Sequence, residues 1–228
     1  MNPGFFAHLR ETGRLTVDAA AETVLPPVVL ALAALALAAS FPGSPAVEGL
    51  ALPTWLAGGL AVAVAAYGAF AALFRLLEEM EAKGILQEAL AAPLAGGALA
   101  LAWLLPAAGA GFAGGFLVLA LGGRIAGFPL ELAPLGPLAF TAAFFAGLAL
   151  PAWLFLPRNW APAFRLYVLP LLVLAGALAP ASAWAPAAKA LILLDPAYQG
   201  AVSLRGFLLP SPPGIHPLWF TGILLALS

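Results

Sequence analysis

The sequence contains very little charge: only 8% of its 228 residues are Asp, Glu, Lys or Arg, whereas 64% are hydrophobic. A soluble domain carries roughly 25% charged residues and about half apolar ones. The surface of this chain therefore cannot face mainly water, and lipid is the solvent that requires no charge. We predict one membrane domain over residues 1–228 and no separate soluble domain.

Cysteine is absent, and histidine occurs only as His8 and His216. Disulfides, thiolate metal sites and a cysteine nucleophile are excluded, and a histidine metal site is not expected. The sequence has neither a P-loop nor a G-x-S-x-G nucleophile elbow. A net charge of −1 provides no basic surface for nucleic acid. These absences predict a protein that is not an enzyme and holds no metal or cofactor of its own.

Long apolar runs dominate what is present. A helix that crosses about 30 Å of hydrocarbon needs roughly 20 mostly apolar residues. The gaps between charges predict spans at Val24–Phe41, Thr54–Phe74, Pro93–Leu121, Leu135–Leu156, Leu166–Trp184 and Pro217–Ser228. The last run is too short for a straight crossing, so we expect this helix to be truncated here; completion of the helix by a neighbour is the alternative. The predicted fold is an all-α integral membrane protein with about six transmembrane helices.

The polar stretch 1–22 precedes the first span. Residues 3–21 alternate apolar and polar groups at roughly helical spacing, which predicts a helix lying flat at the membrane interface. A frayed tail is the alternative, and the length of the stretch argues against a cleaved signal peptide. Basic residues favour the cytoplasmic side of membrane proteins. An N-terminus inside the cell places six of the nine there: Arg10, Arg14, Arg75, Lys83, Arg158 and Arg165.

Acidic side chains are missing from the middle of every predicted span, and Glu131 and Asp195 fall in the outer connections. Intramembrane carboxylates commonly mark proton and ion paths. A proton-coupled transporter and a membrane enzyme are therefore disfavoured, and another subunit is expected to supply energy or chemistry.

Glycines in the third predicted span match two patterns. Residues 109–114 fit G-x-G-x-x-G, but no strand precedes them, so a dinucleotide site is not expected. Gly111 and Gly115 form G-x-x-x-G, the spacing that lets two membrane helices approach closely. We predict that these two glycines serve helix packing within the bundle.

The one charge-dense stretch, residues 77–92, connects the second and third predicted spans on the inner side. Gly84 and Pro93 bound a short helical piece, and Ile85, Leu86 and Leu90 can form one apolar stripe along it. We expect Leu86 to be exposed on this helix and to dock into a groove of a partner. A plain solvated loop is the alternative.

This stretch resembles a motif, E-x-G-T-L-E-x-L-L-x-x-P-L, of the type-2 exporter family of ABC-transporter permeases. Residues 84–94 align without gaps with the part of the motif that begins at its Gly, and Glu81 precedes them. The Gly, the first Leu, the second Leu of the pair, the Pro and the final Leu match, whereas Ile85 replaces Thr and Gln87 replaces Glu. The resemblance implies a cytoplasmic coupling helix that contacts an ABC ATPase subunit. The residues it assigns to that contact are Glu81, Lys83, Gly84, Ile85, Leu86, Gln87, Glu88, Leu90 and Pro93.

A second stretch is similar to the same family, whose members carry an outer segment with Pro and Trp, then Asn-Pro, then Arg-Gly. The matching residues are Trp184, Pro186, Asp195, Pro196, Arg205 and Gly206, with Asp195 in place of the Asn. The resemblance implies outer half-inserted helices over residues 185–209. There, Lys189, Asp195 and Arg205 are expected to reach the outer headgroups or one another.

Together these resemblances imply the permease subunit of an ABC exporter in a bacterial inner (plasma) membrane, moving an amphipathic or lipid-like substrate outward. Such a subunit pairs with a second permease, as a homo- or heterodimer, with the first and fifth spans near the interface. ATP and Mg are held by the partner ATPase. Two alternatives are a haem-exporter-like permease of cytochrome c maturation, against which Arg205 and Gly206 argue, and a non-transporting scaffold or assembly factor.

Overall fold

The computed structural model describes residues 3–41, 43, 46–91, 96–128, 135–155, 180, 183, 185, 192 and 195–208. Its helices are α1 (Pro3–Ala39), α2 (Leu52–Ala82), α3 (Ile85–Ala91), α4 (Gly96–Ala126), α5 (Leu135–Phe155) and α8 (Pro196–Leu208). No strand occurs within these ranges, where the only bridge joins Val47 and Leu50 in a turn. The all-helical prediction is confirmed for the described residues.

Within the described residues, four helical segments are long and apolar enough to cross a membrane, namely Ala21–Ala39, Leu52–Ala82, Gly96–Ala126 and Leu135–Phe155. They coincide with the first four spans that the apolar runs predict, and they agree with a multi-pass membrane protein. The predicted fifth span falls almost entirely outside the described residues, and the predicted sixth span falls wholly outside them.

Helix α1 continues without a break from Pro3 to Ala39. The predicted interfacial segment and the first span are therefore parts of one helix. Pro26 and Pro27 lie inside it. Each removes one N–H donor from the helix, a defect that membrane helices tolerate when neighbouring groups compensate.

Helix α2 is the centre of the bundle. It packs against each of the other described helices, and 78% of its apolar window is buried. The corresponding windows of α1, α4 and α5 are only 28–33% buried. Their outward faces carry exposed apolar side chains such as Leu30, Leu105 and Leu148, which suit contact with lipid.

Helix α4 lies so close to α2 that its glycines face the α2 backbone directly. A Cβ atom added to Gly111 would lie less than 3.0 Å from atoms of Ala65 and Ala69 on α2. One added to Gly115 would lie less than 3.0 Å from atoms of Ala61 and Ala65 on the same helix. Helix association in a membrane relies on such close van der Waals packing, because lipid tails remove the hydrophobic driving force. The structure thus places the predicted pair of glycines at the α2–α4 contact.

Two further glycines of α4 face a different neighbour. A Cβ atom on Gly114 would meet Val24 of α1, and one on Gly122 would lie 2.8 Å from Leu35 of α1. Because Gly111 and Gly115 face α2 while Gly114 and Gly122 face α1, α4 packs tightly into the notch between these two helices.

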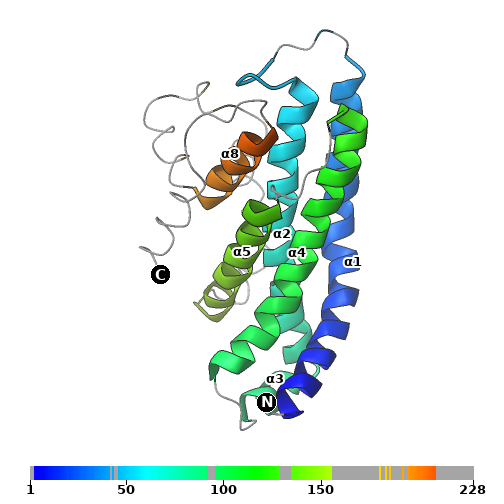
Figure 1. The fold of residues 1–228 in the computed structure, drawn as a ribbon. Coiled ribbons are helices and arrows are strands. Elements are labelled where there is room, and N and C mark those ends of the chain that lie inside the picture. The colour runs from blue at the N-terminus through cyan, green and yellow to red at the C-terminus, as the bar shows by residue number, and fades with distance from the viewer. Residues whose placement is uncertain are drawn as a thin grey trace.

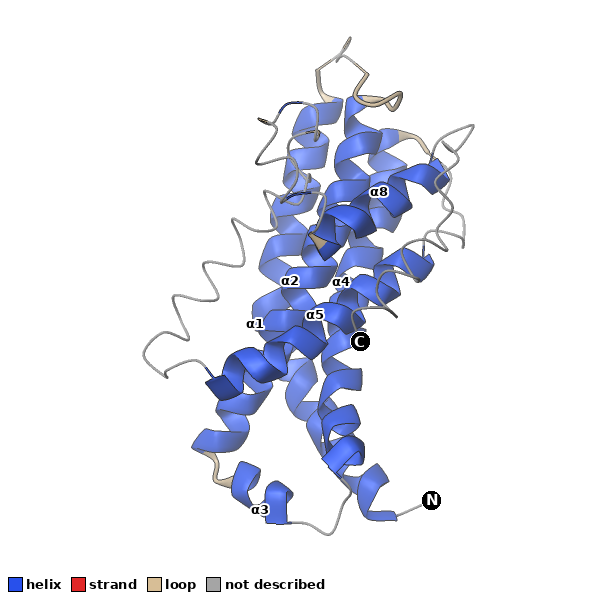
Figure 2. Ribbon diagram, turned by 90° about the vertical axis from the view of Figure 1, so that its left-hand side faces the viewer, coloured by secondary structure: helices blue, strands red, loops and turns tan. Residues whose placement is uncertain are grey.

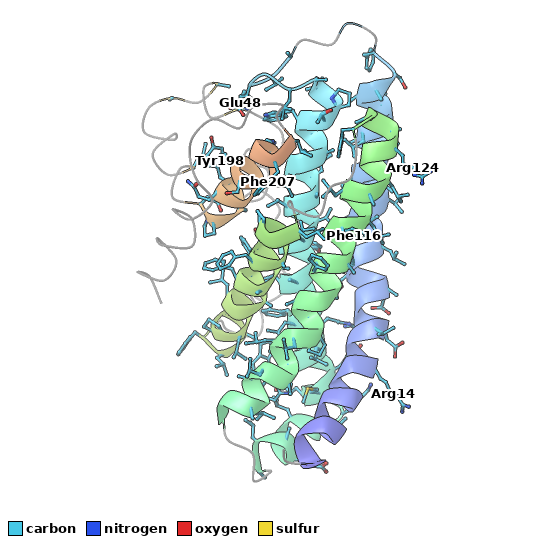
Figure 3. The ribbon with its side chains drawn as sticks, in the orientation of Figure 1. Arg14, Glu48, Phe116, Arg124, Tyr198 and Phe207 are labelled. Carbon is cyan, nitrogen blue, oxygen red and sulfur yellow. The ribbon has the colours of Figure 1, made fainter. Side chains whose placement is uncertain are left out.

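The two ends of the bundle carry different elements (Figure 1). The N-terminus of α1 and the short helix α3 lie at one end, whereas the α1–α2 turn and α8 lie in the other half, as a perpendicular view also shows (Figure 2). Arg14 and Glu48 mark these opposite ends (Figure 3).

We expect the two ends to face opposite sides of the membrane. Lys83, next to α3, has a side chain that is 52% exposed, and Ala46 in the α1–α2 turn is also exposed. In this cysteine-free chain, Lys83→Cys should react with a membrane-impermeant maleimide only from the cytoplasm, and Ala46→Cys only from outside. Labelling of Lys83→Cys in intact cells from the outside would reverse the orientation.

Candidate functional site

Helix α3 begins at a sharp turn after α2. The backbone N–H of Lys83 donates to the carbonyl of Glu79, and that of Gly84 donates to Glu81. Gly84 has φ +73° with open space around its Cα. A side chain is disfavoured in this left-handed conformation, so the glycine allows the chain to leave α2 and start α3 at once.

The structure corrects the predicted direction of the α3 side chains. Leu86 is 9% exposed and packs in the core, together with Ala89 at 6%, whereas Leu90 is 64% exposed. The expectations of an exposed Leu86 and of a single apolar stripe that includes Leu90 are therefore wrong. Gln87 and Glu88 are exposed and Ile85 is half-buried.

An ionic cluster marks the end of α2 that carries α3. The Arg75 guanidinium lies 3.4 Å from the Glu22 carboxylate of α1 and 3.6 Å from that of Glu79, and the Lys83 ammonium lies 3.6 Å from Glu79. Partly exposed pairs of this kind each contribute at most about 1 kcal/mol. These pairs are more informative about position than about stability. Charged groups on both α1 and α2 show where the apolar part of the bundle ends.

The Asp195-Pro196 pair starts α8. The Asp195 carboxylate accepts a hydrogen bond of 2.8 Å from the backbone N–H of Ala197. Asp is a favoured N-cap because its oxygen satisfies such an N–H, and Pro fits the next position because its missing N–H is not needed there. Burial raises the pKa of Asp195. The residues that resemble the family's Asn-Pro thus have a local structural role.

Small residues let α8 dock closely on the bundle. A Cβ atom on Gly58 of α2 would lie 2.9 Å from Cγ of Arg205 and 3.2 Å from Leu204 of α8. On the other side, Gly200 of α8 packs directly against Thr141 of α5. α8 therefore sits on both α2 and α5, where the notch at Gly58 makes room for the stem of an arginine.

Arg205 is the central group of this contact. It is only 4% exposed, and its guanidinium carbon lies 3.7 Å from the ring centroid of Trp55 on α2. Its Nε donates a 3.0 Å hydrogen bond to the carbonyl of Trp55. Arg205 was expected to reach the outer headgroups or Lys189 and Asp195. The first alternative is wrong, because its side chain points into the bundle and is covered.

Glu48 completes the cluster from the α1–α2 turn. The indole Nε1 of Trp55 donates a 3.0 Å hydrogen bond to its carboxylate. Glu48 and Gly49 both have positive φ, at 51° and 83°, in a tight turn closed by hydrogen bonds between Val47 and Leu50. A non-glycine residue in this region costs about 1–3 kcal/mol. Here that cost accompanies the contact with Trp55.

The electrostatics keep Arg205 charged. Burial lowers its pKa to about 10, and the nearby charges of Glu48 and Tyr198 oppose the decrease. Tyr198 on α8 is itself 7% exposed. Its pKa is raised, chiefly by burial and also by Glu48. Since the pKa of Arg205 remains about three units above neutral pH, a cation over the Trp55 ring is the form present at pH 7.

We call Glu48, Trp55, Tyr198 and Arg205 the Arg205 cluster. Among the residues assigned to the outer segment, the structure uses Arg205 in this cluster and Asp195 and Pro196 at the helix start, while Gly206 has open space around its Cα. Sequence reasoning missed the other three members, because nothing local links Trp55 to a residue 150 positions away. Pro93, Trp184, Pro186 and Lys189 lie outside the described residues.

The described part of the chain contains no group of three His, Cys, Asp or Glu side chains that could hold a metal ion. In comparisons with known proteins, no family model, no curated protein and no solved structure matches this chain.

Proposed function

We propose that this chain is the membrane-spanning permease subunit of an ABC-type exporter. In this role it moves an amphipathic or lipid-like substrate outward across the bacterial inner membrane, pairs with a second permease subunit, and draws energy from a separate ATPase that holds ATP and Mg. The observation that carries the proposal is the placement of α3 at the end of α2, with Leu90 64% exposed.

We infer that Leu90 meets a protein partner and not lipid, because it lies beyond the charged end of the apolar bundle. The ionic cluster of Glu22, Arg75, Glu79 and Lys83 marks the boundary of the apolar bundle, and α3 follows it at the tip of the structure (Figure 1). A seven-residue helix is too short to be stable alone in water. Contacts of Leu86 and Ala89 with the core fix it, which gives Leu90 a defined position for docking.

Helix α2 provides the route from this docking surface to the rest of the chain. It contacts α3 at one end and also packs against α1, α4, α5 and α8. Closure of an ATPase against α3 would push on this central helix, and through it on every described helix. Energy could then reach the far half of the bundle without any nucleotide site on this chain.

We expect Leu90→Asp to release the ATPase while the bundle stays folded. Burial of a leucine contributes about 1.5–3 kcal/mol, so retention of the ATPase should decrease about tenfold or more. Leu90→Met, which keeps the apolar contact, should behave as the parent chain, and Glu88→Gln should cost less than about 1 kcal/mol. The measurement is ATP hydrolysis and ATPase content of the tagged chain after purification in lipid nanodiscs with its ATPase.

Equal retention by Leu90→Asp and the parent would make α3 a simple connection. Absence of an ATPase from the purified parent would favour a scaffold or assembly factor instead.

A further inference from the structure

The face that α8 turns to the bundle has few large apolar side chains. Its buried residues are Ala197, Tyr198, Gly200, Ala201, Leu204 and Arg205. Hydrophobic stabilisation grows with the apolar area removed from water, and the alanines and the glycine contribute little of it. Leu204 is the only large aliphatic side chain in this set, and Val202 and Leu208 add partly buried contacts with the core. With so few large apolar groups, the polar contacts of α8 are expected to carry a substantial part of its attachment.

Arg205 makes the most specific of these contacts. Its guanidinium stacks on the Trp55 ring at 3.7 Å and its Nε donates to the Trp55 carbonyl at 3.0 Å. The attraction between a cation and an indole ring is strongest where water is excluded, and Arg205 is only 4% exposed. Through Trp55, the Glu48 carboxylate adds a third element to the same contact.

The rest of the bundle has its own contacts. Gly111 and Gly115 hold α4 on α2, and Gly114 and Gly122 hold α4 on α1. These contacts lie outside α8 and do not involve the Arg205 cluster. Proteins open locally in cooperative units, and units with few buried apolar contacts open first.

We propose that Arg205 is the positioning residue that holds α8 on α2, and that α8 is a separately releasable segment that can leave the bundle without unfolding it. Release can be measured without an ATPase, so the proposal does not rest on the proposed function. The cysteine-free chain allows single thiols to report on it.

The reporter is Ala201→Cys, at a position on α8 that is 1% exposed. Its alkylation by a water-soluble maleimide is measured in lipid nanodiscs, with Ser203→Cys as the control for access because Ser203 is half-buried. Arg205→Met should raise the alkylation rate at position 201 about tenfold or more, equivalent to a decade in the opening equilibrium. The rate at position 203 should change less than about twofold, and the thermal unfolding midpoint of the bundle should stay within a few degrees.

Two further variants test the mechanism. Arg205→Lys keeps a cation but loses the planar group that stacks and donates through Nε, so its rate should lie between those of the parent and Arg205→Met. Trp55→Phe keeps an aromatic face and should have a small effect, whereas Trp55→Leu should resemble Arg205→Met. Combining Trp55→Leu with Arg205→Met should add little to the larger single effect, because the two residues form one contact.

Two results would overturn the proposal. A rate for Arg205→Met at or below that of the parent would mean that apolar packing holds α8, since replacing a buried charge by an apolar side chain can be neutral. A faster rate that is accompanied by loss of the unfolding transition would mean that α8 is an integral part of the bundle and is not separately releasable.

Discussion

Replacing Gly111 with alanine is expected to destabilise the bundle strongly, whereas the same change at Gly109 should not. A Cβ atom at Gly111 would come under 3.0 Å from α2 backbone atoms of Ala65 and Ala69, and backbone cannot move aside as a flexible side chain can. Gly109 lies on the same helix with open space around its Cα. Overpacking costs about 1–3 kcal/mol and occasionally more, and we expect the upper part of this range.

The matched pair separates packing from helix propensity. Alanine in place of glycine favours a helix by up to about 1 kcal/mol at either position, so propensity alone predicts a stabilising change for both. We expect the apparent unfolding midpoint in detergent, at one fixed scan rate, to decrease by about 5–10 °C for Gly111→Ala. Gly109→Ala should remain at or slightly above the parent. Similar midpoints for the two variants would show that α2 and α4 are further apart than the structure has them.

Span positions are predictable because they depend on length and local hydropathy alone. Helix α1 begins 21 residues before its predicted span. The ends of α2, α4 and α5 differ from the prediction by at most five residues, except for the C-terminal end of α2, which extends eight residues further. That end extends to Ala82 because charged residues there continue the helix beyond the hydrocarbon, with Arg75 and Glu79 one turn apart. Apolar length sets where a span must exist, but it does not set where the helix stops.

The orientation of α3 was harder to predict because the helix has only seven residues. Leu86 and Leu90 are about 40° apart around a helix axis, which suggested one stripe. The buried face instead centres between Leu86 and Ala89, and Leu90 lies about 100° from Ala89 around the axis, outside this face. A small residue carries little weight in an apolar pattern, yet Ala89 defines the buried face here.

The two parts of the outer segment show the same distinction between local and distant causes. Asp195 and Pro196 start α8 by chemistry confined to a few residues, so their role can be inferred from the sequence. Arg205 contacts Trp55 across 150 positions, and no local pattern indicates that contact. Arginine near a predicted membrane surface is ordinarily placed with its charge in water. The notch at Gly58 and the carboxylate of Glu48 make a buried position possible instead.

Leu86→Asp is expected to detach α3 from the bundle. The side chain is 9% exposed within the core, so the change loses about 1.5–3 kcal/mol of burial and adds the desolvation cost of a carboxylate. α3 is too short to be stable alone, so it should unfold once it separates. The loss is limited to this docking, because the α2–α4 glycine contacts lie elsewhere.

Trypsin provides a direct measurement, since Lys83 stands at the start of α3 and is already half-exposed in the folded chain. Cleavage after Lys83 requires the chain around Gly84 to open. We expect Leu86→Asp to accelerate it about tenfold or more relative to the parent, with the unfolding transition of the bundle retained. Leu86→Met keeps the apolar volume and should be cleaved at the parental rate.

Leu90→Asp is the matched control, because it places the same carboxylate one turn away on an exposed position. It should leave the cleavage rate nearly unchanged. Equal acceleration by both variants would mean that α3 is held by Leu90 as much as by Leu86, against the burial in the structure. The difference between them also decides how a loss of ATPase binding is interpreted. Leu86→Asp removes the docking helix itself, whereas Leu90→Asp changes only the surface that a partner would contact.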